Sequence, residues 1–231
     1  MSKRIFIDGS VNSELCIIAA DGQEINYFDY SDDLATSKKN NIYLGTVSRV
    51  EPSLQAAFIE FGAEKKAFLP FDEIHPSYFK IPHNEKILIK DNDKNSDVDD
   101  EKESKKHFLS FYRKYKIQDV IKKDQVLLVQ IVKEERGTKG AAITTFISLP
   151  GRYSVLLPNN SSTGGVSKKI SNPLDRKRLK KLHDNFNLPE GMSLIIRTNA
   201  ISAEDDDIIA DFSYLRKLWT KIREDTLKSK A

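Results

Sequence analysis

Two phenylalanines, Phe58 and Phe68, lie ten residues apart in a segment that reads as three short strands, residues 40–70. Aromatic faces stack on nucleobases and nearby cations pair with phosphates, so these residue types suit a surface for single-stranded RNA. The alternative is that both rings belong to a core, because Phe on a half-buried strand is commonly buried. The basic residues around them are Lys38, Lys39, Arg49, Lys65 and Lys66.

Arg197 and Thr198 form a second pair suited to chemistry, at the end of the strand predicted over residues 194–198. A guanidinium can hold two phosphate oxygens at once, while a hydroxyl and backbone N–H groups bind the others. Gly151 would allow the backbone to approach such a phosphate closely, because it has no side chain. Taken alone, a surface ion pair of Arg197 is the simpler interpretation.

The acidic residues and histidines form no predicted catalytic or metal site. Asp205, Asp206 and Asp207 begin a helix, where negative charge favours the helix dipole and explains the cluster without a metal. The single cysteine, Cys16, excludes a disulfide framework and predicts a buried thiol. The histidines are scattered without ligand spacing and without a nucleophile partner: His75, His83, His107 and His183.

Length and charge predict one large domain or two small ones with a moderately basic body. The net charge of the 231 residues is only +3, but residues 91–106 contain seven acidic residues against four lysines. We expect a mobile, disordered acidic insert at about residues 91–107. Its single valine buries too little apolar surface to offset the entropy lost when the segment is ordered. No stretch reaches membrane-spanning length and residues 1–9 lack a signal-peptide core, which predicts a cytoplasmic protein.

Most of the expected elements are strands, and two helices are expected after residue 171. Asn172 and Pro173 form the start of the first helix. Ser202 and Asp205 have capping-box spacing and open the second, whose apolar face we expect to be only partly covered. That face consists of Ile208, Ile209, Phe212, Leu215, Trp219 and Ile222. The predicted strands are residues 4–7, 14–20, 25–28, 42–50, 56–61, 126–132, 141–145, 146–149, 153–157 and 194–198.

Four sequence blocks resemble, in the same order, the N-terminal portion of bacterial endoribonucleases of the ribonuclease E and G family. They are residues 40–70, 133–160, 164–170 and 191–200, and the stretch EPSLQAAF favours the ribonuclease E branch. The resemblance implies an α+β, mostly β fold with a five-stranded OB-fold (S1-type) barrel over residues 37–145. It also implies a 5′-sensor subdomain over residues 146–201 and an incomplete RNase H-like subdomain formed by residues 1–36 and 202–231.

The resemblance also assigns site residues. It places Phe58, Phe68 and Lys139 in the RNA channel of the barrel, with Lys133 near the same surface. Lys168 stands where the family usually has an arginine, so the charge is kept but planar two-point contact is lost. The pocket for a 5′-monophosphate is implied to consist of Gly151, Val155, Arg197 and Thr198.

The family's catalytic aspartates, which hold Mg²⁺, and its zinc-binding cysteines lie downstream of the matching blocks, so no cofactor is expected in this chain. The resemblance therefore predicts single-stranded RNA binding and 5′-monophosphate sensing in RNA processing and decay, without cleavage by this chain alone. Expected partners are such RNA, the catalytic half of the enzyme and further copies of the chain. Two alternatives stay open: a nuclease in its own right, and a non-catalytic RNA-binding or assembly protein.

Overall fold

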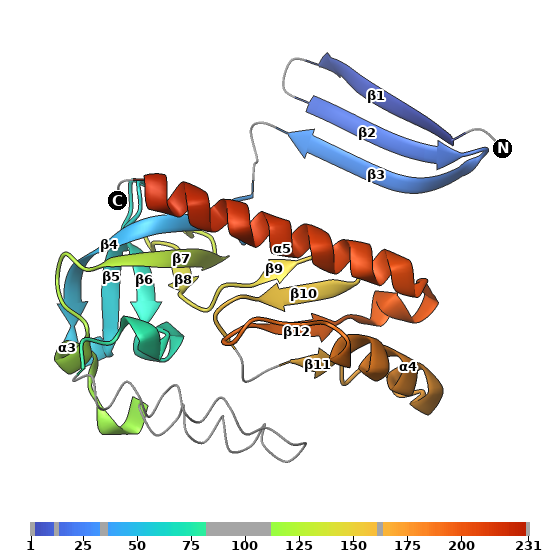
Figure 1. Ribbon diagram of the computed structural model, residues 1–231. Helices are drawn as coiled ribbons and strands as arrows, with labels where there is room; N and C mark the ends of the chain where they lie inside the picture. The colour runs from blue at the N-terminus through green and yellow to red at the C-terminus, as the bar shows by residue number, and fades with distance from the viewer. Residues whose placement is uncertain (1–2, 12–13, 33–36, 82–111, 161–163, 230–231) are drawn as a thin grey trace. The chain divides into compact units, whose positions relative to one another are not determined.

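The computed structural model of the chain consists of two compact units, Met1–Lys38 and Lys39–Ala231 (Figure 1). The structure describes residues 3–11, 14–32, 37–81, 112–160 and 164–229. The acidic insert expected at about residues 91–107 lies outside the described residues, so its mobility stays a prediction.

The first unit is an antiparallel sheet of β1 (Lys3–Val11), β2 (Glu14–Asp21) and β3 (Glu24–Asp32), with β2 in the centre. Gly22 has a φ of 65° in the turn between β2 and β3, a left-handed conformation that favours glycine. Ile5 and Phe6 are consecutive and therefore point to opposite faces of the sheet, yet 71% and 52% of their surfaces are exposed. Cys16 is a free thiol and is half-buried rather than buried.

The second unit begins with a closed barrel of five strands. Its strand order is β4-β5-β6-β8-β7, in which β6 and β8 are parallel and the other neighbours antiparallel. Side chains at alternate positions, including Ile59, Leu69 and Val129, are fully buried, as a period of two requires. The predicted five-stranded barrel is confirmed. Its strands are β4 (Ile42–Glu51), β5 (Ala56–Glu60), β6 (Ala67–Pro70), β7 (Val126–Lys133) and β8 (Ala142–Thr144).

Short helical turns accompany the barrel strands. They are η2 (Pro52–Leu54), η3 (Phe71–Glu73), η4 (Pro76–Tyr78) and α3 (Ile117–Val120). Two of them, η3 and α3, add the buried residues Phe71, Ile117 and Val120 to the barrel core. The rings of Phe71 and Phe79 stack with centroids 5.4 Å apart, and Tyr112 packs edge-on against both. Burial raises the pKa of the Tyr112 hydroxyl, so it stays protonated and donates to the carbonyl of Ile74.

A second sheet follows, with the order β11-β12-β10-β9. Its strands are β9 (Leu149–Pro150), β10 (Ser154–Leu157), β11 (Gly165–Val166) and β12 (Ser193–Ile196). The prediction of a strand over residues 146–149 is wrong except at Leu149, where β9 begins. The backbone N–H groups of Ile147 and Ser148 instead donate to the side chains of Asn159 and Gln130, so they are not free to join a ladder.

Two helices belong to the second sheet. In α4 (Pro173–Asp184), the Asn172 side chain accepts from the N–H of Leu174, which confirms the predicted cap. The start predicted for the other helix at Ser202 is wrong, because Ser202 belongs to the turn η5 (Thr198–Ser202) and α5 (Asp205–Lys228) begins after Glu204.

Helix α5 runs along β9 and β10 and reaches the barrel (Figure 1). Ile208, Phe212 and Leu215 are buried against the second sheet, whereas Ile209 is 42% exposed. Further along, Trp219 and Ile222 are half-buried and belong to the same cluster as Ile42 and Leu128 of the barrel. One helix therefore joins the second sheet to the barrel. The expected association of residues 1–36 with residues 202–231 stays a prediction.

Candidate nucleic-acid interface

The register of the barrel strands places five residues side by side in one transverse row. Arg49 on β4 pairs with Phe58 on β5, and Phe58 pairs with Phe68 on β6. Phe68 pairs with Ala142 on β8, and Ala142 pairs with Lys133 on β7. Cross-strand partners project from the same face of a sheet, so these residues form one strip across the barrel, here called the barrel row.

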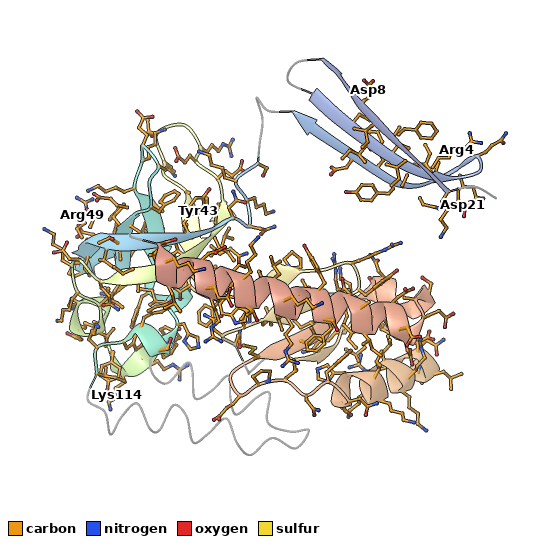
Figure 2. All side chains as sticks on the ribbon, turned by 45° about the horizontal axis from the view of Figure 1, so that its top comes forward. Arg4, Asp8, Asp21, Tyr43, Arg49 and Lys114 are labelled. Carbon is orange, nitrogen blue, oxygen red and sulfur yellow. The ribbon has the colours of Figure 1, made fainter. Side chains whose placement is uncertain are left out.

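The barrel row lies on the outside of the barrel. Its two rings are half-buried, while their neighbours along the strands, including Ala57, Ile59 and Leu69, are fully buried. The Phe58 and Phe68 rings meet edge to face with centroids 5.9 Å apart. The guanidinium carbon of Arg49 lies 4.4 Å from the centroid of Phe58, at the outer surface of the barrel (Figure 2). The row thus combines aromatic surface with a cation at each end.

Lys139 stands on an ordered turn between β7 and β8. Arg136 and Lys139 exchange both backbone hydrogen bonds, and Gly137 between them has a φ of 57°, where L side chains are strained. Lys65 donates to the carbonyl of Gly137 at 2.7 Å. A Cβ on Gly140 would lie 2.0 Å from the Lys66 carbonyl oxygen, so glycine is required where the two loops meet. The turn holds the Lys139 backbone in place while its side chain is exposed.

The lysines around the row differ in how far their charges are compensated. Lys66 forms an ion pair with Glu60 at 2.8 Å and lowers the pKa of that carboxyl. Lys65 lies 3.9 Å from Glu135. Among the residues described, neither Lys133 nor Lys139 has a carboxylate within ion-pair distance. Of these four lysines, the two that lack a carboxylate partner in the described ranges are therefore the two that the resemblance assigns to the RNA surface.

Arg197 and Gly151 are in direct contact at the edge of the second sheet. The Arg197 guanidinium donates to the Gly151 carbonyl at 2.6 Å, and the Arg197 N–H donates to the Tyr153 carbonyl at 2.8 Å. Thr198 follows as an exposed residue, and Val155 is half-buried on β10. In the described part of the chain, Arg197 makes no ion pair. These four residues, Gly151, Val155, Arg197 and Thr198, are called the Arg197 cluster below.

Lys168 leaves the second sheet near the Arg197 cluster rather than near the barrel row. Strands β11 and β12 are parallel, and Val166 pairs with Ile196. Because parallel strands run in one direction, the residues after Val166 and those after Ile196 leave the sheet at the same edge. Lys168 is exposed there, two residues beyond Val166. The structure therefore divides the predicted site residues between two regions.

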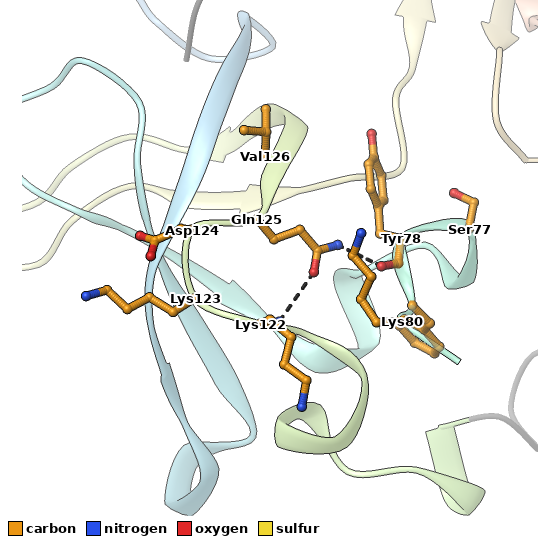
Figure 3. Close-up of a pocket in the computed structure, with 9 residues that line it drawn as sticks. Ser77, Tyr78, Lys80, Lys122, Lys123, Asp124, Gln125 and Val126 are labelled. Carbon is orange, nitrogen blue, oxygen red and sulfur yellow. Dashed lines mark hydrogen bonds between the residues drawn. The ribbon is translucent and has the colours of Figure 1, made fainter. Parts of the chain in front are cut away.

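A basic hollow on the barrel, with a volume of about 540 Å³, was not singled out by the sequence (Figure 3). Lys80, Lys122 and Lys123 line it together with Asp124. The Gln125 side chain donates to the Tyr78 carbonyl and accepts from the Lys122 N–H, which ties the walls together. None of the barrel-row residues lines this hollow.

The described ranges offer neither a cluster of metal ligands nor a membrane-spanning helix. No group of three or more His, Cys, Asp or Glu side chains in those ranges could hold a metal ion. No helix in those ranges combines the length and apolar character needed to cross a membrane.

Comparison with known proteins gives consistent matches. Residues 148–231 match the sequence model of the Ribonuclease E/G family. The chain is 39% identical over 229 residues to ribonuclease E of Buchnera aphidicola subsp. Schizaphis graminum, covering 99% of this chain and 21% of that protein. It is 39% identical over 222 residues to ribonuclease E of Escherichia coli K12, covering 96% and 18%. For ribonuclease G of Salmonella typhimurium, the identity is 39% over 184 residues, covering 80% and 32%. The chain thus spans about a fifth to a third of the length of these relatives.

Proposed function

Because this chain belongs to the ribonuclease E/G family, we propose that it is the RNA-binding part of a ribonuclease that acts in RNA processing and decay. In this proposal the barrel is an S1-type OB-fold that binds single-stranded RNA, and the second sheet senses a 5′-monophosphate. The observation that carries the proposal is the barrel row, in which two half-buried rings lie between two cations.

The barrel row is suited to an unpaired strand rather than to a duplex. Bases of an unpaired strand can stack on the exposed parts of Phe58 and Phe68, because every base has an aromatic face. Lys133 at the end of the row and Lys139 on the neighbouring turn supply charge for the phosphates. Stacking is tolerant of sequence, so we expect binding with little base preference.

The Arg197 cluster is suited to a terminal phosphate. One hydrogen bond to Gly151 fixes the guanidinium of Arg197. A guanidinium has five N–H donors, so the remaining donors can hold two phosphate oxygens. The Thr198 hydroxyl lies next in the chain and is exposed, and Lys168 adds a positive charge at the same edge of the sheet.

The proposal assigns binding, and not cleavage, to this chain. Hydrolysis of a phosphodiester needs a group that activates water, commonly a metal ion held by carboxylates. In this proposal the Mg²⁺ and Zn²⁺ sites belong to the part of the relatives that this chain does not span. The partners are then single-stranded RNA with a 5′-monophosphate, the catalytic half of the enzyme and other copies of the chain.

The proposal is tested with one 3′-labelled, unstructured RNA that carries a 5′-monophosphate, a 5′-triphosphate or a 5′-hydroxyl. Fluorescence anisotropy should show the tightest binding for the monophosphate. Phe58→Ala should weaken binding to all three RNAs by about 1–3 kcal/mol, because a stacking surface is lost. Arg197→Ala should remove the preference and leave binding to the hydroxyl RNA unchanged. Equal affinity of the wild-type chain for all three ends would refute the sensing function.

One observation favours a second function, as an assembly protein that does not act through RNA. The sheet of β1–β3 exposes large apolar side chains on both faces, such as Ile5 and Phe6, and exposed apolar surface is typical of protein-binding sites. An RNA affinity that is indifferent to salt would favour this function, because phosphate contacts weaken as salt rises.

A further inference from the structure

The carboxylate of Asp211 on α5 accepts four hydrogen bonds from one short segment, residues 151–154. Its Oδ1 accepts from the N–H of Arg152 at 2.9 Å. Its Oδ2 accepts from the N–H groups of Tyr153 and Ser154 at 3.1 and 2.9 Å, and from the Ser154 hydroxyl at 2.7 Å. Hydrogen bonds to a carboxylate are stronger than those between neutral groups, so this segment is firmly anchored to α5.

A side chain at Gly151 would meet the carboxylate of Asp211. A Cβ at this position would lie 2.6 Å from each of the Asp211 carboxylate oxygens, which is closer than such atoms approach one another. The sequence suggests instead that Gly151 makes room for a phosphate. In the structure the space where a Cβ of Gly151 would lie is already occupied by the carboxylate.

Asp211 also changes which groups the segment can offer to a ligand. The N–H groups of Arg152, Tyr153 and Ser154 are bound to Asp211, and the N–H of Gly151 donates to the Ser154 carbonyl at 2.8 Å. These four N–H groups are therefore occupied. What the segment contributes to the Arg197 cluster is the Gly151 carbonyl, which accepts from the Arg197 guanidinium.

We propose that Asp211 is a positioning residue for recognition of the 5′-phosphate. Its carboxylate fixes the segment at residues 151–154, and the carbonyl of Gly151 in that segment then orients the Arg197 guanidinium. Asp211 acts through Arg197 and does not touch the phosphate. This inference rests on the proposed sensing of a 5′-monophosphate by the Arg197 cluster.

A purely structural role in docking α5 is the rival interpretation. Helix α5 has other anchors, because Ile208, Phe212 and Leu215 are buried to 7% exposure or less against the second sheet. The buried apolar face should hold the helix when the carboxylate is removed. Loss of Asp211 should therefore loosen the segment at residues 151–154 more than it loosens the helix.

The test compares Asp211→Ala and Asp211→Asn with Arg197→Ala. The control is Asp225→Asn, which removes one charge from an exposed position on the same helix. The quantity measured is the ratio of the dissociation constants for 5′-hydroxyl and 5′-monophosphate RNA. We expect Asp211→Ala to lower this ratio to that of Arg197→Ala, with unchanged affinity for the hydroxyl RNA. In Asp211→Asn, an NH₂ donor replaces one acceptor oxygen and faces N–H groups, to which it cannot bind. The ratio of dissociation constants for Asp211→Asn should therefore also fall. Asp225→Asn should keep the wild-type ratio.

Two further measurements separate positioning from stability. Amide hydrogen exchange should accelerate at Arg152, Tyr153 and Ser154 in Asp211→Ala and stay slow in the buried part of α5. Gly151→Ala should lower the melting temperature of the wild-type chain, because its Cβ meets the carboxylate. In the Asp211→Ala background the same change should have a smaller effect, and this coupling is the signature of direct contact.

The outcomes distinguish the two proposals. A wild-type chain without preference for the monophosphate would overturn both. A wild-type preference that survives in Asp211→Ala would overturn the positioning role alone and leave the sensing function intact. If both Asp211 variants are unfolded at the temperature of the assay, Asp211 is a structural residue and the inference is wrong.

Discussion

The guanidinium of Arg49 lies over the ring of Phe58, 4.4 Å from its centroid, with the two residues paired across β4 and β5. The sequence places Arg49 only among the basic residues around the two phenylalanines. The register places it at the end of the barrel row, where it covers part of the surface on which a base would stack. A base that approaches Phe58 must therefore stack on the guanidinium or displace it, and arginine is well suited to the former.

Arg49→Ala should weaken binding of 5′-hydroxyl single-stranded RNA by about 0.5–1 kcal/mol, the size of an exposed cation–aromatic interaction. Arg49→Lys keeps the charge but loses the planar surface, so it should recover only part of the affinity. Anisotropy titrations at one salt concentration measure both effects. The control is Lys123→Ala, which removes an exposed cation of the barrel that lies outside the row. Equal losses for Arg49→Ala and Lys123→Ala would show that only net charge matters.

The salt dependence of binding should distinguish Lys139 from Lys66. Lys139 has no carboxylate partner among the described residues, whereas Lys66 is paired with Glu60 at 2.8 Å. Each phosphate contact to a single strand contributes about 0.7 to the slope of log K against log salt. Lys139→Ala should make the slope shallower by about that amount, and Lys66→Ala should change it less. Titrations at four or more salt concentrations give the slopes. Identical slopes for wild type and Lys139→Ala would remove Lys139 from the interface.

Gln130 should be a strong determinant of stability, because it joins the barrel to the second sheet. Its side chain donates to the carbonyls of Asn40 and Ser148 at 2.9 and 2.8 Å, and accepts from the N–H and hydroxyl of Ser148. It is 3% exposed. Gln130→Leu leaves buried polar groups without partners, at about 1–3 kcal/mol for each such group. We expect a clearly lower melting temperature. Unfolding can be measured by the fluorescence of Trp219, the single tryptophan.

The control for Gln130 is Gln118→Leu. Gln118 is half-buried and its side chain accepts one longer hydrogen bond, from Gln55 at 3.3 Å. The Gln118→Leu substitution should therefore change the melting temperature much less than Gln130→Leu does. A melting temperature of Gln130→Leu equal to that of Gln118→Leu would mean that water replaces the partners of Gln130.

The sequence predicts those features that depend on neighbouring residues. A period of two identifies the barrel strands, and Asn172 before Pro173 marks the start of α4. It does not predict features that depend on distant partners. The Gln130 side chain reaches Ser148 and shortens β9, and Asp211 lies 57 to 59 residues from the N–H groups that it binds. In the sequence, Asp211 stands beside the apolar face of the helix, three residues after Ile208 and four before Leu215, but the N–H groups that it binds cannot be read from neighbouring residues.

Arg178 should hold the turn that follows Arg197 and Thr198. Its guanidinium donates to the carbonyls of Ala200, Ile201 and Ala203 at 3.0 to 3.1 Å, and it forms an ion pair with Asp205 at 2.8 Å. Ala200 and Ile201 belong to η5 and Ala203 caps its end, so Arg178 fixes the turn that leads into α5 at Asp205. A lysine ammonium at this site cannot reproduce the planar fork that reaches all four oxygens.

Arg178→Lys should therefore destabilise the second unit by about 1–3 kcal/mol, because carbonyls lose charge-assisted donors. For a chain of this size, that corresponds to a fall in melting temperature of about 2–4 °C for each kcal/mol. The matched control is Arg176→Lys on the same helix, because Arg176 donates to two carbonyls at longer distances, 3.2 and 3.5 Å. If both variants melt at the same temperature, the turn after Thr198 is held by its own backbone. In that case Arg178 has no part in arranging the Arg197 cluster.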